Sequence, residues 1–174
     1  MTPNELKQAS RHVFYELEML VDTANALQFR AGLDRVTRNA LLESFGLHTR
    51  SLLDFLTRTT PLKDTVYAAQ YFGAGKWSTA SLPLVLTPVA EDANKHLAHL
   101  TETRMAFEPP LEKQWLPGPI ADALLRLMDT SFYQPVDKTL LHEEWANGLP
   151  ELQGVTMNMN ATGTAAQMAA AGKG

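Results

Sequence analysis

The residues best suited to chemistry in this chain are histidines and arginines in two separate stretches. His99 is followed five residues later by Arg104, and His48 lies two residues before Arg50. Histidine has an ordinary pKa close to neutrality, and the forked guanidinium of arginine binds phosphate oxygens in pairs. If the two stretches are neighbouring helices, Arg50 and Arg104 can both face His99, which predicts acid–base or phosphate chemistry. The candidate catalytic residues are therefore His99, Arg50, Arg104 and His48.

A metal site is a second interpretation of the histidines. His96 and His99 are three residues apart, which lets two imidazoles on one helix bind the same ion, and His48 would be a third ligand. Metal sites of carboxylate-rich bundles also need paired glutamates that face inward, whereas this chain offers single acids at Glu16 and Glu43. We therefore expect neither a metal nor another cofactor.

A third interpretation makes the same polar residues structural. His48, Arg50, Asp54 and His99 can form a hydrogen-bonded layer that fixes the register between helices. Glu16 also has two interpretations, because it lies beside the apolar stripe of its helix. It is either a residue at the rim or an acid that points into a polar pocket, and the sequence leaves both open.

A long amphipathic helix is expected at the start of the chain. Thr2 and Glu5 have the spacing of a capping box around Pro3, so the helix begins there and ends before Gly32. Its apolar residues recur at intervals of three and four and form one stripe: Leu6, Ala9, Val13, Leu17, Leu20, Ala24 and Leu27.

A second long helix is expected from Asp34, which is suited to cap it, to Thr60, and the short link makes it antiparallel to the first. Its stripe consists of Leu41, Leu42, Phe45, Leu52, Phe55 and Leu56. His48 and Thr49 fall within that stripe. We therefore expect both side chains to be buried and to have hydrogen-bond partners.

The rest of the chain predicts a long crossover loop over residues 62–86, with a short helix over 64–72. Prolines and capping residues predict a long helix over 87–109 and another over 117–135. Residues 137–145 are expected to add one or two helical turns.

These elements predict an all-α fold, an antiparallel bundle of four to five helices with a long crossover loop, because each apolar stripe needs neighbours to cover it. The bundle domain is expected over residues 1–152. Lys173 is the single charged residue between positions 155 and 174, which are rich in alanine, threonine and asparagine. Residues 153–174 are therefore expected to be a low-complexity flexible tail.

The composition excludes several classes of protein and of functional site. A chain of 174 residues that is 45% hydrophobic can bury one substantial core. The absence of cysteine excludes disulfides, thiolate metal sites and cysteine nucleophiles. No apolar run approaches the roughly 18 residues that a membrane span needs, so we expect a cytoplasmic protein without membrane partners. The net charge of -4 argues against blanket neutralisation of nucleic-acid phosphates.

Two stretches resemble the HEPN superfamily, namely residues 39–56 (NALLESFGLHTRSLLDFL) and 94–101 (NKHLAHLT). Members of that superfamily are all-helical, often dimeric domains of toxin and antiviral systems, and many are metal-independent RNases. The resemblance implies a HEPN-like bundle over residues 5–135 and matches His99 to the histidine of the family's arginine-x4-6-histidine motif. Asn94 holds the place of the arginine, so the resemblance supports the fold more than the RNase activity. If activity survives, Arg50 or Arg104 takes the arginine's role.

Two functions remain open at this stage. The resemblance implies a homodimeric RNA-processing or RNA-binding module of a bacterial or phage defence or toxin-type system. The alternative is a non-catalytic helical protein-interaction module whose buried layer of histidine, arginine and aspartate is structural. Convergence of His48, Arg50, His99 and Arg104 in one accessible cleft would favour the first function, and their dispersal would favour the second.

Overall fold

The computed structural model describes residues 1–60, 62–73, 76–78, 82–92 and 116–154. In these ranges all regular structure is helical, which confirms the all-α prediction for the described part. The α-helices are α1 (Pro3–Phe29), α2 (Arg35–Thr57), α3 (Thr87–Asp92) and α6 (Pro117–Met128). The shorter elements are η1 (Ala68–Tyr71), a π-helical turn η3 (Asp129–Tyr133), η4 (Lys138–Leu140) and η5 (Glu143–Asn147).

Helix α1 begins at the predicted capping box. The backbone N–H of Thr2 donates to Glu5 Oε2 at 2.7 Å, and the backbone N–H of Glu5 donates to Thr2 Oγ1 at 3.3 Å. The helix ends at Phe29, and Gly32 in the following turn has a φ of 74°, which glycine adopts without strain. Both predicted ends of this helix are confirmed.

Helix α2 is capped by Asp34, as predicted. Oδ1 of Asp34 accepts hydrogen bonds from the backbone N–H groups of Val36 at 2.8 Å and Thr37 at 3.0 Å. The helix ends at Thr57, three residues before the predicted end, and Arg58 is extended. Pro61 has no backbone N–H to donate to the carbonyl of Thr57, and it disfavours helical backbone at Thr60, which together explain the earlier end.

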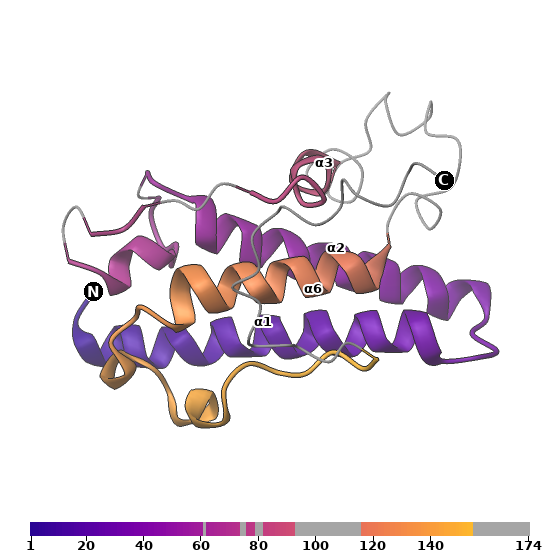
Figure 1. Ribbon diagram of the computed structural model, residues 1–174, viewed down its shortest axis with the longest axis horizontal. Coiled ribbons are helices and arrows are strands. Elements are labelled where there is room, and N and C mark those ends of the chain that lie inside the picture. Colours follow the sequence, from indigo (N-terminus) through magenta and orange to yellow (C-terminus); the bar gives the residue numbers. More distant parts are fainter. Residues whose placement is uncertain (61, 74–75, 79–81, 93–115, 155–174) are drawn as a thin grey trace, which may run out of the picture.

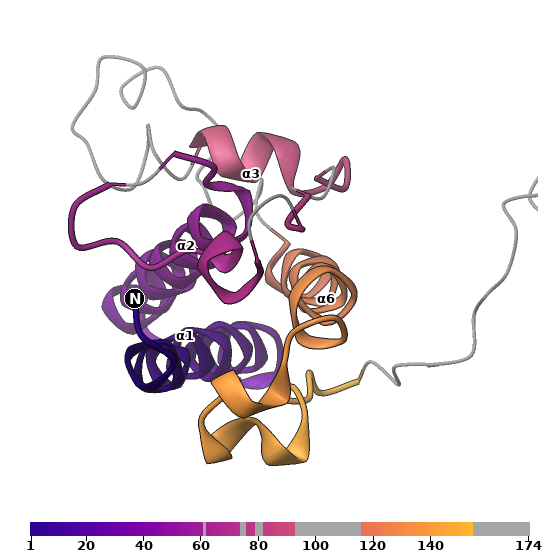
Figure 2. The same ribbon diagram turned by 90° about the vertical axis from the view of Figure 1, so that its left-hand side faces the viewer.

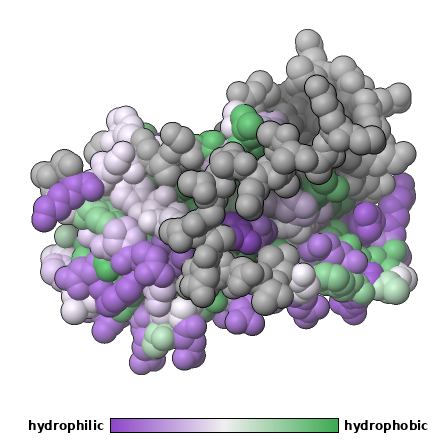
Figure 3. All heavy atoms as spheres, viewed as in Figure 1, coloured by the Kyte–Doolittle hydropathy of each residue, from purple (hydrophilic) through white to green (hydrophobic). Residues whose placement is uncertain are grey.

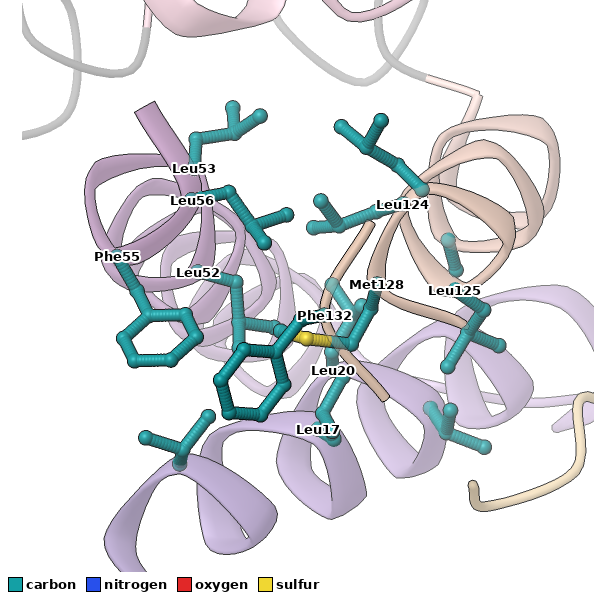
Figure 4. Close-up of a cluster of buried hydrophobic side chains, with 14 of the residues drawn as sticks. Leu17, Leu20, Leu52, Leu53, Phe55, Leu56, Leu124, Leu125, Met128 and Phe132 are labelled. Atoms are coloured by element: carbon teal, nitrogen blue, oxygen red, sulfur yellow. The ribbon is translucent and has the colours of Figure 1, made fainter. Parts of the chain in front are cut away.

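The three long helices lie side by side, with α1 antiparallel to both α2 and α6 (Figures 1 and 2). Their facing sides form the hydrophobic core, which is shown in Figure 4. The labelled core residues are Leu17, Leu20, Leu52, Leu53, Phe55, Leu56, Leu124, Leu125, Met128 and Phe132, and all are at most 5% exposed. The apolar stripes predicted for α1 and α2 therefore face each other and α6.

The crossover after α2 contains less helix than predicted. The predicted helix over 64–72 is longer than the observed one, since only η1 is helical there. Asp64 has a φ of 59°, which no residue of a right-handed helix adopts. Tyr71 at the end of η1 anchors this region to α1, since its hydroxyl donates to the backbone oxygen of Leu6 at 2.9 Å. Burial raises the pKa of Tyr71, so the phenol keeps the proton that it donates.

The segment after α6 packs against the side of α1 that faces away from α2 (Figure 2). Elements η4 and η5 confirm the one or two turns expected over 137–145. Ser10 holds this segment through two contacts: its hydroxyl accepts from the backbone N–H of His142 at 2.8 Å, and its backbone oxygen accepts from Trp145 Nε1 at 2.9 Å.

Two predictions concern residues outside the described ranges. Helix α3 contains the predicted start at Thr87, but the continuation to residue 109 lies outside them. Residues 155–174 of the expected tail also lie outside the described part of the chain, so the division at residue 152 stays a prediction.

Candidate functional site

His99 and Arg104 lie outside the described residues, as do Asn94 and His96. The expected convergence of His99 and Arg104 with His48 and Arg50 is therefore still a prediction. His48 and Arg50 are both placed on α2, and the environment of His48 can be built from its neighbours on α1.

His48 is buried at the contact between α1 and α2, where it forms a close pair with Glu16. The imidazole Nδ1 lies 2.8 Å from Glu16 Oε2, and the two side chains are 9% and 29% exposed. Because a carboxylate oxygen can only accept, Nδ1 carries the hydrogen of this bond. Of the two interpretations left open for Glu16, the structure shows an acid that points toward a buried polar partner.

Tyr15 packs against the ring of His48. The two rings meet nearly at right angles, at 83°, with their centroids 6.0 Å apart. The histidine is thus enclosed between a carboxylate and an aromatic ring, and its ring has little surface in contact with solvent.

The remaining predicted polar residues of α2 do not join this pair. Asp54 binds Arg58 one turn further along the helix, with Arg58 Nε 3.0 Å from Asp54 Oδ2. Arg50 is half-buried and donates no hydrogen bond to another described residue. Within the described part, the partner of His48 is therefore Glu16 from α1 and neither Arg50 nor Asp54.

A hollow of about 180 Å³ opens beside the pair, between α1, α2 and the crossover. Its lining residues are Ala9, His12, Val13, Glu16, Ser51, Leu52, Phe55 and Val66. Most of these side chains are apolar, and Glu16, His12 and Ser51 supply the polar groups. We call this space the α1–α2 pocket. It has room for one apolar group, since an apolar cavity of about 150 Å³ in another protein holds benzene.

Glu16 belongs both to the pair and to the α1–α2 pocket. Because His48 binds Oε2, the carboxylate is held in place at the pocket wall. An apolar ligand group in the pocket can therefore carry a hydrogen-bond donor or a positive charge that reaches a fixed carboxylate.

Three pocket residues were not singled out from the sequence. His12 lies four residues before Glu16, so the two follow one ridge of α1, and this spacing was visible in the sequence. Ser51 and Val66 carry no such signal. Val66 comes from the crossover, whose path depends on tertiary contacts that a sequence pattern does not contain.

Two further findings concern metal sites and membrane-spanning helices. Among the described residues, no group of three or more histidine, aspartate or glutamate side chains is placed to hold a metal ion. None of the helices in the described ranges is long and apolar enough to cross a membrane.

Figure 3 shows one face of the molecule. Among the residues that it colours by hydropathy, hydrophobic residues are scattered among hydrophilic ones. Scattered apolar residues are normal on a protein surface and do not mark a binding site. The α1–α2 pocket is therefore the feature that suggests a ligand.

Comparisons of the chain with protein-family models, with curated proteins and with solved structures found no match.

Proposed function

We propose that this chain is a non-catalytic helical protein-interaction module, in which the α1–α2 pocket receives an apolar side chain of a partner. The observation that carries the proposal is that His48 is 9% exposed and bound to Glu16, whereas the pocket beside it is lined mainly by apolar residues. The His48–Glu16 pair is then structural: it fixes the contact between α1 and α2 and orients the carboxylate.

The chemistry of the pocket also supports binding over RNA cleavage by these residues. An acid–base catalyst must come within hydrogen-bond distance of the reacting group, and Tyr15 and Glu16 enclose the ring of His48. Among the described lining residues, Glu16 brings a carboxylate to the pocket beside His12, and this carboxylate repels a phosphate.

The proposal includes the fold of the whole chain. Three long helices that bury their apolar sides against one another support a four- to five-helix HEPN-like bundle, and α3 supplies the start of a further helix. A homodimer, as the resemblance implies, is part of the same proposal and is tested by the molar mass in solution.

The pocket is tested with the side-chain analogue N-acetyl-leucine amide in an NMR titration of the labelled protein. We expect weak binding, with a Kd on the order of 1–10 mM for one apolar side chain, and shifts at the amides of Ala9, Ser51 and Phe55. Ser51→Leu fills the pocket from α2 with a good helix former and should abolish these shifts.

Ser44→Leu is the matched control, because Ser44 is equally half-buried on α2 and does not line the pocket. It should leave the titration unchanged. Shifts that persist in Ser51→Leu, or a wild-type protein that shows none at the pocket, would exclude this binding site.

RNA processing is the second candidate function, and the resemblance of residues 39–56 and 94–101 favours it. Here we expect purified protein to cleave RNA in the presence of a chelator, because the superfamily reaction needs no metal, and His99→Ala to stop the cleavage. RNA that stays intact with both proteins would exclude the enzymatic function and leave the interaction module.

A further inference from the structure

A second hollow lies next to the α1–α2 pocket, toward the start of α1. This second hollow has a volume of about 580 Å³ and is lined by Met1, Asn4, Glu5, Gln8, Leu62, Asp64, Thr65, Val66 and Gln70. Val66 lines both hollows, so they are adjacent. We call the two hollows together the α1 groove.

One ridge of α1 forms a wall along the whole groove. Asn4 and Gln8 line the second hollow, and His12 and Glu16 line the α1–α2 pocket. These four residues are spaced four apart, which places them in a row on one side of the helix. With a rise of about 1.5 Å per residue, the row is about 18 Å long.

The length of this row suits an extended chain. At about 3.3–3.6 Å per residue, some five extended residues span the row. Successive side chains of an extended segment point in opposite directions, so one can enter the α1–α2 pocket while its neighbours stay at the rim. The pocket volume of about 180 Å³ accommodates a single large apolar side chain rather than a helix face.

The polar groups of the groove suit the backbone of such a segment. The side-chain amides of Asn4 and Gln8 each carry donors and an acceptor, as a peptide group does, and neither makes a hydrogen bond to another described residue. Two amides one helical turn apart can therefore bind the backbone of a partner without selecting its sequence.

The charges of the groove select a basic partner. Among its described lining residues, Glu5, Glu16 and Asp64 carry carboxylates and none is a lysine or arginine, while Met1 adds one amino group beside Glu5. Glu5 is engaged in the cap of α1, whereas one oxygen of Glu16 is not bound by His48. A lysine or arginine beside the apolar anchor can bind that oxygen, which is held at the wall of the pocket.

We propose that the α1 groove binds an extended segment of a partner protein, about five residues long, that places one large apolar side chain in the α1–α2 pocket and a neighbouring lysine or arginine at Glu16. This inference rests on the proposed interaction function and names the class of partner. Asn4 and Gln8 hold the backbone of the segment, and Ser51 lines the pocket that receives the apolar side chain.

The test is a screen of random heptapeptides displayed on phage against the immobilised full-length chain. The enriched sequences should contain a leucine, isoleucine, methionine or phenylalanine with a lysine or arginine within two residues. Synthetic peptides of those sequences are then titrated with wild type and variants by fluorescence anisotropy.

Glu16→Gln keeps an oxygen for His48 and removes the charge, so the Kd should rise about five- to tenfold and depend less on salt. The double variant Asn4→Ala/Gln8→Ala should raise the Kd by a similar factor for all enriched peptides. Glu18→Gln on the exposed side of α1 and Asn39→Ala on α2 are the matched controls, and both should bind as the wild type does.

Enrichment of acidic peptides, failure to enrich any sequence, or equal binding by Glu16→Gln and Glu18→Gln would overturn the groove proposal. The interaction function itself fails separately, when N-acetyl-leucine amide does not bind or binds equally to Ser51→Leu. Circular dichroism and the Tm of each variant distinguish loss of binding from loss of fold.

Discussion

Trp145→Ala is expected to lower the free energy of unfolding by about 3–5 kcal/mol, the range for removal of a buried indole. Trp145 is 2% exposed and packs against Phe14, Phe132 and Tyr133, with centroid distances of 5.3, 5.8 and 5.7 Å. Its Nε1 also donates to the backbone oxygen of Ser10 at 2.9 Å. The side chain therefore joins the segment after α6 to helix α1. Urea unfolding followed by circular dichroism measures the loss.

Trp145→Phe is the matched variant, because it keeps an aromatic ring in the core and removes only the indole N–H and part of the volume. It should cost about 1–2 kcal/mol, which is less than the loss expected for alanine. If Trp145→Ala unfolds with nearly the wild-type free energy, the segment after α6 is not part of the folded core.

Glu16→Ala is expected to lower the free energy of unfolding by about 1–3 kcal/mol, the cost of leaving a buried polar group without its partner. The side chain of His48, which is 9% exposed in the wild type, would lose its acceptor Glu16 Oε2. Glu16→Gln retains an oxygen at that place and should lose less than half as much. Equal stability of wild type and Glu16→Ala would show that the pair contributes nothing to the contact between the helices.

The first residues of α1 and α2 were predictable because the caps that start these helices are local. Thr2 and Glu5 cap α1 within one turn, and Asp34 caps α2 through the backbone N–H groups of Val36 and Thr37. The burial of His48 and Thr49 was also predictable, since both lie in the apolar stripe of α2 and are 7% and 0% exposed.

The candidate site was predictable only in part, because its partners come from different elements. His48 binds Glu16, which is 32 positions earlier in the chain, and the rotation of α2 about its own axis decides this pairing. A periodic pattern fixes which side of a helix is buried but not which polar residue of the neighbouring helix meets it. Val66 reaches the groove through a crossover whose path is fixed by Tyr71 and its bond to Leu6.

A double-mutant cycle on His48 and Glu16 tests the central structural claim most directly, namely that these two side chains bind each other and hold the carboxylate at the wall of the α1–α2 pocket. The free energies of unfolding of His48→Ala, Glu16→Ala and the double variant are compared with that of the wild type. We expect the loss in the double variant to be smaller than the sum of the two single losses by about 1 kcal/mol or more. Losses that add to within about 0.3–0.5 kcal/mol would contradict the pairing.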